Sequence, residues 1–307
     1  MSESKQKEPL VNFKFEDMKV STRTFTATTN ITMNIFEISN ALPVYATVDT
    51  RLRGSKGDSM NAALSDIPTG SIISVNYLGK IRGFNLKPRK KNKRWFRNSF
   101  TVVIHAGDKL INFKVCRNGT FQITGALSFQ HAVHCIKCVW QNIKNTKHYS
   151  INDGRQTLHA LIIPAMRNLD FTLGIKINRE MFDKYIIDKN DKYHCLLETS
   201  FGYTGLNVKK KITKPISKLK ILELNITNDS DWAGNIVTYE KYLDILSPDA
   251  REAKIKHTRY NTFLVFHSGK IIQSGMSSDF MKDDFYDFCE IINNAYRDGF
   301  IEEKLDE

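Results

Sequence analysis

The chain has 307 residues, of which 41 % are hydrophobic and 25 % charged, which is the composition of a globular protein rather than a disordered one. Its formal net charge is +12 and its isoelectric point lies near 9.3, so we expect an anionic partner, with nucleic acid ahead of an acidic protein or a membrane surface. The five cysteines lack the spacing of a disulfide framework and the longest apolar runs are too short for a bilayer, which indicates an intracellular protein that is neither secreted nor membrane-bound.

The first half of the chain, residues 18–150, predicts strands and helices in a definite order after a flexible polar tail at 1–17. From Phe25 the run FTATTN alternates as a strand does, and Thr32 stands where the N-cap of a short helix is expected. A Gly/Ser/Asp-rich stretch indicates an insertion at about 46–70. Four strand-like runs follow, SIISVNYLG, FTVVIHA, KLINFKV and TFQIT, and then a long amphipathic helix within SFQHAVHCIKCVWQNIKN.

The hairpin around NGTFQITG separates two kinds of side chain. A three-residue loop, Asn118 to Thr120, collects the apolar residues of both strands on one face. These residues are Phe113, Val115, Phe121 and Ile123, and the opposite face receives Lys114, Cys116, Gln122 and Thr124. The first face is predicted to meet the helices, and the second to stay open to water or a ligand.

The second half of the chain, residues 151–307, repeats the pieces of the first in the same order. FTLGIKINREMFD at Phe171 echoes the run at Phe25 with an offset of 146, GLNVK at 205–209 echoes GFNLK at 83–87, and SGKIIQSG echoes NGTFQITG with an offset of 150. The predicted strands are YHCLLETSF, LKILELNI, TFLVF and KIIQ, followed by a long helix within DDFYDFCEIINNAYRDG. An insertion at about 228–256 ends in a helical pattern. The fold class is therefore α+β, with antiparallel strands and helices on one face, built twice.

The second hairpin places apolar side chains on the face that is predicted to carry no helices. Phe263, Val265 and Ile271 form the set that faces the helices. The opposite face receives Leu264, Phe266, Ile272 and Ser274. Apolar groups on such a face indicate a binding surface or a cover.

At these residues the sequence resembles the TATA-box-binding protein family, as a divergent member similar to the copies in large DNA viruses. The matching text is NGTFQITGA in the first half and SGKIIQSG, preceded by LVF, in the second, within a likeness over roughly residues 18–300. The resemblance implies a saddle with pseudo-two-fold symmetry: one curved antiparallel sheet, helices on the convex face, and a concave face that binds the DNA minor groove.

The resemblance also implies a function and partners. It implies a monomeric, non-catalytic transcription initiation factor that binds double-stranded DNA and recruits RNA polymerase subunits and a TFIIB-like initiation factor. Its place would be the nucleus or a cytoplasmic viral replication site. The alternative is a transcription-complex scaffold that keeps the saddle without binding DNA, and a third possibility is a nuclease or glycosylase that uses the fold as an accessory.

In the family, apolar wedges enter between base steps and small residues line the groove. By motif, the wedge that ends the fourth strand aligns with Cys116 and Phe266, and the wedge that opens the third strand aligns with Phe100, whose counterpart is either Tyr203 or Leu219. The implied DNA-binding residues are Phe100, Lys114, Cys116, Gln122, Thr124, Leu264, Phe266, Ile272 and Ser274. The family's paired asparagines fall near Val20 and Met166, where this sequence has none.

Two basic runs, KPRKKNKR at 87–94 and KKKITK at 209–214, stand at matching places in the two halves. They predict phosphate contacts on either side of a duplex. The residues expected to make them are Lys87, Arg89, Lys90, Lys209, Lys210 and Lys211. The alternative is a pair of solvated loops, the first of which doubles as a nuclear-import signal.

The run HAVHCIKC places His131, Cys135 and Cys138 on one helix face. A closed zinc site needs four ligands, usually from more than one element, so we expect core packing and neither a metal nor another cofactor. The sequence contains no phosphate-binding loop, dinucleotide fingerprint, zincin motif or nucleophile elbow. We therefore expect no enzyme activity.

Overall fold

The computed structural model describes residues 8–45, 67–84, 96–197, 205–226 and 232–302. The chain forms two compact units. One, here the first-repeat unit, consists of residues 23–164 and 220–238, and the other, the second-repeat unit, consists of residues 1–22, 165–219 and 239–307. The boundary between the halves, predicted after residue 150, falls at residue 164, and the second half of the sequence contributes a segment to the first-repeat unit. Residues 8–17, predicted as part of a flexible tail, pack on the second-repeat unit, where Val11 and Phe15 are buried.

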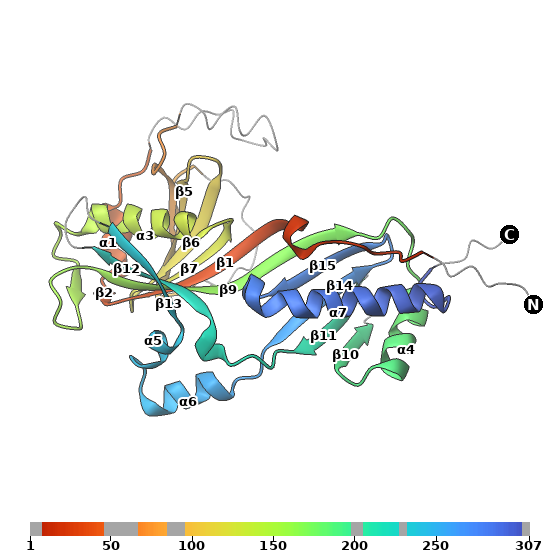
Figure 1. Ribbon diagram of the computed structural model, residues 1–307. Coiled ribbons are helices and arrows are strands. Elements are labelled where there is room, and N and C mark those ends of the chain that lie inside the picture. The colour runs from red at the N-terminus through yellow and green to blue at the C-terminus, as the bar shows by residue number, and fades with distance from the viewer. Residues whose placement is uncertain (1–7, 46–66, 85–95, 198–204, 227–231, 303–307) are drawn as a thin grey trace, which may run out of the picture. The chain divides into compact units, whose positions relative to one another are not determined.

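The first-repeat unit contains an antiparallel sheet in the order β1-β7-β6-β5-β3-β4 (Figure 1). Its elements are β1 (Lys19–Thr29, which enters from the other unit), β2 (Ile31–Met33), α1 (Ile35–Ala41), β3 (Ile72–Tyr77), β4 (Lys80–Gly83), β5 (Ser99–His105), β6 (Leu110–Cys116), β7 (Thr120–Ala126), α3 (Phe129–Ile143) and β8 (Tyr149–Ile151). The short strands β2 and β8 pair separately.

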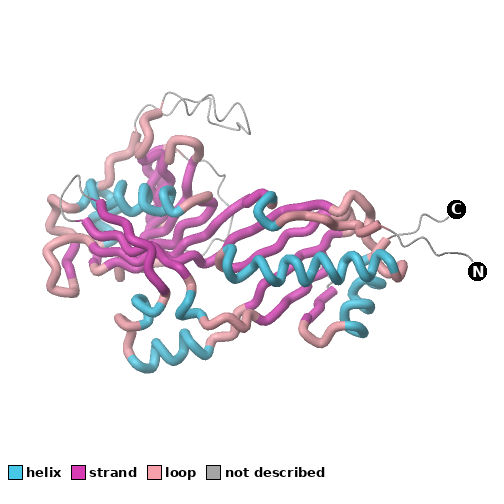
Figure 2. Tube along the Cα trace, in the orientation of Figure 1, coloured by secondary structure: helices cyan, strands magenta, loops and turns pink. Residues whose placement is uncertain are grey.

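The second-repeat unit repeats this order of elements. Its elements are the 3-10 turn η1 (Phe15–Asp17), β9 (His159–Thr172, which begins in the other unit), α4 (Arg179–Lys189), β10 (Tyr193–Leu197), β11 (Gly205–Lys211), β14 (Tyr260–Phe266), β15 (Lys270–Gly275) and α7 (Ser278–Arg297). The sheet order is β10-β11-β14-β15-β9, which matches β3-β5-β6-β7-β1 strand for strand. Figure 2 shows α7 running along the strands of this sheet.

The predicted fold class is confirmed, because each unit is an antiparallel sheet with two helices, α1 and α3 or α4 and α7, packed on one face. In the first-repeat unit Phe113 and Phe121 pack with Cys135 and Val139 of α3. In the second-repeat unit Phe263 stacks on Phe288 of α7 with ring centroids 4.0 Å apart. Each fully buried phenylalanine contributes roughly 1.5–3 kcal/mol. The predicted saddle arrangement of the two units stays a prediction.

The duplicated hairpin depends on its glycines. Gly119 and Gly269 have φ of +75° and +82°, and a Cβ on either would lie 2.2 Å from a backbone oxygen, of Ile31 and of Ile175 respectively. Only glycine combines this φ with this close approach at little cost. The loops have three residues, 117–119 and 267–269, one position earlier than predicted in the first hairpin, and the apolar residues lie on one face as expected.

The offset between the two copies is 144 residues at the first strand and short helix, not the predicted 146. Asn34 caps α1 and Asn178 caps α4, so the N-cap expected at Thr32 was wrong by two residues. Phe36 is 54 % exposed, and the residue that corresponds to the buried Phe182 is Ile38. A slip of two leaves the strand's faces unchanged, which is why the sequence alone did not reveal it.

The strand predicted from LKILELNI exists, but it belongs to the first-repeat unit. As β12 (Lys220–Ile226) it pairs with residues 159–162 of β9 and with β13 (Trp232–Thr238). In the second repeat the strand expected from LKILELNI is replaced by β11, which pairs with β14 as β5 pairs with β6. GLNVK at the start of β11 therefore corresponds to β5. The predicted match of GLNVK with GFNLK, which begins at the last residue of β4, was wrong. His159 Nε2 lies 2.9 Å from Glu223 Oε1, a buried pair that ties β12 to β9.

The insertion in the second repeat therefore extends from the end of β11 to the start of β14. Besides β12 and β13 it contains η4 (Ile216–Lys218), α5 (Glu240–Leu243) and α6 (Pro248–Lys256). The helix predicted in its second half is thereby confirmed as α6. The insertion predicted at 46–70 lies almost wholly outside the described residues. None of the helices in the described parts of the chain combines the length and apolar character that crossing a bilayer requires.

Candidate nucleic-acid interface

One face of the first-repeat sheet is covered by none of the helices in the described residues, and we call it the first open face. The register places Gln122 between Thr26 and Lys114, and Thr124 between Thr24 and Asn112. Gln122, Thr124 and Asn112 are exposed, and Lys114 is half-buried. Thr28, Thr120, Ser99, Thr101 and Cys116 also belong to this face, whose edge at Val103 is buried against Ile67 and Ile73. Four of the predicted DNA-binding residues, Lys114, Cys116, Gln122 and Thr124, thus come together on a mostly polar surface.

A depression of about 600 Å³ lies at the hairpin end of the first open face. Its wall includes Phe96, whose ring is 70 % exposed. The Lys114 ammonium stands 4.8 Å from the centroid of that ring, within range of a cation–π interaction. Sequence reasoning missed Phe96, because it precedes the strand and belongs to no alternating pattern.

Phe100 does not belong to the first open face. Its side chain is 1 % exposed and lies in the core under the helices, so its predicted contact with DNA does not fit the structure. The residue opposite Cys116 is Ser99. Both side chains at this corner are therefore small, and burial raises the pKa of the Cys116 thiol although the charge of Lys114 opposes the shift.

The corresponding surface of the second-repeat sheet, the second open face, is more apolar. Leu264 lies between Asn207 and Ile272 in the register. Phe266 lies opposite Gly205, where an added Cβ would stand 2.6 Å from Leu264 Cδ1 and 3.6 Å from Phe266 Cε1. Glycine at 205 thus leaves room for these two side chains to fold over the strand. The predicted set Leu264, Phe266, Ile272 and Ser274 is half-buried on this one face.

The residue of the second repeat that corresponds to Phe100 was expected to be Tyr203 or Leu219. The strand register shows that it is neither of them. Phe100 lies opposite Val115, and Leu206 lies opposite Val265, so Leu206 occupies that position in the second copy. Leu206 is fully buried. Tyr203 lies outside the described residues.

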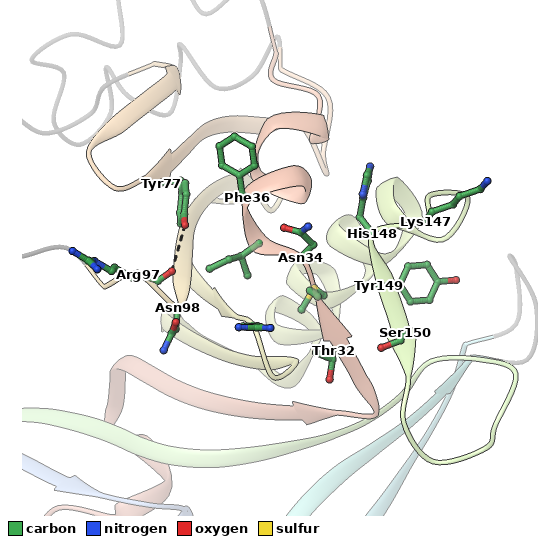
Figure 3. Close-up of a pocket in the computed structure, with 13 residues that line it drawn as sticks. Thr32, Asn34, Phe36, Tyr77, Arg97, Asn98, Lys147, His148, Tyr149 and Ser150 are labelled. Atoms are coloured by element: carbon green, nitrogen blue, oxygen red, sulfur yellow. Dashed lines mark hydrogen bonds between the residues drawn. The ribbon is translucent and has the colours of Figure 1, made fainter.

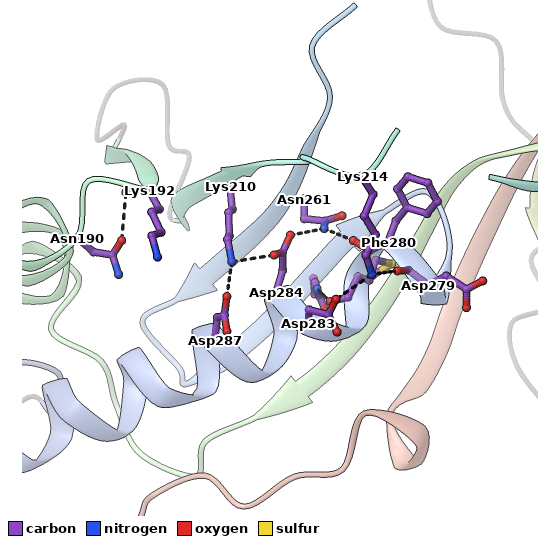
Figure 4. Close-up of polar contacts among 12 residues, drawn as sticks. Asn190, Lys192, Lys210, Lys214, Asn261, Asp279, Phe280, Asp283, Asp284 and Asp287 are labelled. Atoms are coloured by element: carbon purple, nitrogen blue, oxygen red, sulfur yellow. Dashed lines mark hydrogen bonds and ion pairs between the residues drawn. The ribbon is translucent and has the colours of Figure 1, made fainter. Parts of the chain in front are cut away.

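The three consecutive lysines at the end of β11, Lys209 to Lys211, alternate between the two faces of the sheet. Lys209 lies between His194 and Thr262 on the second open face, and Lys211 is exposed. Lys210 turns to the opposite face and pairs with Asp284, at 2.8 Å, and with Asp287 of α7 (Figure 4). The predicted phosphate contact of Lys210 is therefore incompatible with its position. Lys87, Arg89 and Lys90 lie outside the described residues.

Polar residues of the first strands also reach the open faces. Asn168 of β9 lies opposite Ser274, and Thr24 of β1 lies opposite Thr124. The family's paired asparagines were expected near Val20 and Met166, which precede Thr24 by four residues and Asn168 by two. The second copy therefore carries an asparagine beside Ser274, and the first copy carries a threonine at the equivalent place.

The cysteines of the run HAVHCIKC are core residues, as predicted. Cys135 and Cys138 are buried, and burial raises the pKa of both thiols, that of Cys138 to about 12. His131 Nδ1 accepts a hydrogen bond from the Leu127 amide, and its Nε2 lies 3.0 Å from Asp108. Within the described ranges, no three His, Cys, Asp or Glu side chains are grouped so as to hold a metal ion.

No protein-family model matches the chain. It is 26 % identical over 216 residues to "Uncharacterized protein 335L" of Invertebrate iridescent virus 6, a match that covers 68 % of this chain and 64 % of the viral protein, so less than two thirds of that relative is represented. Among solved structures, the TBP of Methanococcus jannaschii matches with a TM-score of 0.44 and 13 % identity, over 90 % of this chain and 98 % of that one.

Proposed function

We propose that this protein binds double-stranded DNA through its two open sheet faces and acts as a TATA-box-binding-protein-like transcription initiation factor. The observation that carries the proposal is a pair of matching sheet faces that none of the described helices covers, in a chain with a net charge of +12. Such charge favours association with a polyanion, and a broad strand surface with short side chains fits a widened minor groove.

The two faces supply different contacts in this proposal. On the second open face Phe266, Leu264 and Ile272 form an apolar group suited to the sugar and base edges of a minor groove, with Phe266 as the side chain that enters between base steps. On the first open face Lys114 and Gln122 supply charge and hydrogen bonds. The sequence dependence of binding would then arise mainly from how easily the DNA deforms.

We propose further that the helix-covered faces and the insertion between β11 and β14 bind RNA polymerase subunits and a TFIIB-like initiation factor. The protein would act as a monomer without catalytic activity of its own. The similarity to an iridescent virus protein supports a viral setting, either in the nucleus or at a cytoplasmic replication site.

The alternative function is a scaffold in a transcription complex that does not contact DNA. One observation favours it: at the hairpin corner of the first open face Ser99 and Cys116 are too small to separate stacked bases. In that case the open faces would hold protein, and DNA affinity would be weak and indifferent to sequence.

Fluorescence anisotropy separates the two functions. A·T-rich and G·C-rich duplexes are titrated at two salt concentrations with the wild-type protein, with Phe266→Ala/Ile272→Ala, and with Ile187→Ala as a control at an exposed apolar residue of α4 in the same unit. We expect salt-dependent binding, tighter on A·T-rich DNA, that the double variant weakens about tenfold or more and the control leaves unchanged. Equal binding by all three proteins would favour the scaffold.

A further inference from the structure

A second depression of the first-repeat unit, of about 560 Å³, lies beside the paired strands β2 and β8 (Figure 3). Three backbone hydrogen bonds hold its walls together. The Arg117 amide donates to Asn98 O at 2.9 Å, the Met33 amide donates to Arg117 O at 2.8 Å, and the Asn34 amide donates to His148 O at 2.8 Å. Four segments that are far apart in the sequence are thereby fixed around one pocket.

Basic side chains surround this pocket. Tyr77 and Arg97 stand on one side, Lys147 and His148 stand on the other, and Thr32 and Asn34 lie between them (Figure 3). Arg117 and Asn98 complete the lining near the hairpin. None of the 13 lining residues is acidic, and in the described part of the chain no carboxylate forms an ion pair with Arg97, Arg117 or Lys147.

A pocket whose lining holds cations and no carboxylate has a positive potential, which attracts an anion. Two guanidinium groups, an ammonium group, two side-chain amides and four hydroxyl groups offer many donors. A phosphate group, with up to four oxygens, satisfies more of them than a carboxylate does, and the guanidinium fork matches its geometry. We propose that this pocket binds a phosphate group at Arg117, with Arg97 and Lys147 as flanking cations on its two sides.

Two sources of phosphate fit the geometry. Thr32, Asn98 and Arg117 line this pocket and also the depression on the first open face. A nucleic-acid strand on the open face could therefore place a backbone phosphate here. A free nucleotide is the other source, because Phe36 and Tyr77, with ring centroids 6.3 Å apart, form an aromatic wall against which a base can pack. The proposal does not require the protein to bind DNA.

The test compares two variants that lose the same charge. Arg97→Gln/Arg117→Gln removes two cations of the pocket, and Lys184→Gln/Lys189→Gln removes two cations of α4 in the other unit. Isothermal titration calorimetry measures binding of inorganic phosphate and of AMP, and anisotropy measures duplex binding between 50 and 200 mM salt, roughly the range in which phosphate contacts dominate affinity. Circular dichroism confirms that both variants fold.

Each source predicts its own pattern. If the pocket holds a free nucleotide, AMP binds more tightly than inorganic phosphate, and only the pocket variant loses affinity, by about tenfold or more. If it holds a backbone phosphate, the pocket variant lowers the slope of log K against log salt by about 1 relative to the control, because one phosphate contact is lost.

The two proposals fail separately. AMP binding that depends on the pocket in a protein without DNA affinity would uphold the phosphate site and reject the proposed function. The phosphate site is rejected if the pocket variant and the control variant behave alike toward phosphate, AMP and DNA.

Discussion

The first and second open faces share one framework and differ in chemistry. Lys114, Cys116 and Gln122 on the first correspond to Leu264, Phe266 and Ile272 on the second. On the helix-covered side the corresponding residues stay large and apolar, Phe113 with Phe263 and Val115 with Val265. The comparison teaches that packing against the helices restrained one side of both hairpins, whereas the other side diverged toward two kinds of contact.

The hairpin glycines test whether the two copies share one structural requirement. Gly119→Ala and Gly269→Ala should each destabilise their unit by about 3 kcal/mol or more, because a Cβ would add a clash with a backbone oxygen to the strain of positive φ. Gly125→Ala is the control, since it also has positive φ but has open space around it, and should cost about 1 kcal/mol.

Urea denaturation distinguishes the glycine variants by unit. All three tryptophans fall within the residue ranges of the first-repeat unit, so fluorescence reports that unit while far-ultraviolet circular dichroism reports both. Equal stability of Gly119→Ala and Gly125→Ala would contradict the role assigned to the carbonyl of Ile31.

The wedge position tests the difference in chemistry. Phe266→Ala should weaken duplex binding by about 1–3 kcal/mol, the range found for aromatic contacts with bases, whereas Cys116→Ala should leave the affinity unchanged. Introducing the larger side chain at the first corner, Cys116→Phe, should strengthen binding. Anisotropy measures all three, with Ile187→Ala as the control. The comparison breaks down if Cys116→Ala weakens binding as much as Phe266→Ala.

The lysines of the two faces provide a smaller effect. Lys114→Gln and Lys209→Gln should each lower the slope of log K against log salt by about 1, and should weaken binding to A·T-rich and G·C-rich duplexes alike. Lys210→Gln should leave the slope unchanged, because that side chain pairs with α7. A loss that depends on DNA sequence would instead indicate that Lys114 or Lys209 contacts base edges.

The smallest effect concerns the stability of the second-repeat unit. Burial alone would lower the pKa of Lys210, but hydrogen bonds to Asp284 and Asp287 and their negative charges outweigh it, so the pKa is raised. A raised pKa means that the pair stabilises the fold below about pH 10.5 and that this contribution is lost as pH rises through the folded-state pKa.

Lys210→Ala should therefore lower the free energy of unfolding by about 1 kcal/mol at pH 8, a modest value because the pair is partly exposed. Above the folded-state pKa of Lys210 the substitution should cost almost nothing. Urea midpoints followed by circular dichroism at pH 8 and at a pH above the folded-state pKa of Lys210 measure the difference. Lys189→Ala, at an exposed position of α4, is the control. A cost that is equal at both pH values would mean that Lys210 acts through its packing rather than its charge.

The duplication was predictable because its strongest signals are physically obligatory. The glycines at 119 and 269 tolerate no Cβ, and the alternating residues around them must bury one face. The register of the first strand was less constrained, since a slip of two residues preserves the pattern. That ambiguity displaced the expected N-cap from Asn34 to Thr32.

Strand pairing and burial set the limit of prediction elsewhere. The alternation in LKILELNI identifies a strand but not its partner, and only the structure shows that it pairs with β9. Phe100 was assigned to the open face because it opens a strand, whereas the residue on that face is its neighbour Ser99. Arg97, Arg117 and Lys147 belong to no local sequence motif. They line one pocket only because backbone hydrogen bonds join segments that are far apart in the sequence, which the sequence alone does not reveal.

The chain passes between its two units four times, after residues 22, 164, 219 and 238. During translation the first-repeat unit lacks Leu224 and Ile226 of its core until more than two thirds of the polypeptide has been made. The start of the chain must wait longer, because Val11 exchanges hydrogen bonds of 2.8 and 2.9 Å with Asn293 of α7. Neither half of the gene would then encode an autonomous folding unit, and nascent chains would expose unfinished sheet edges to chaperones until synthesis is nearly complete.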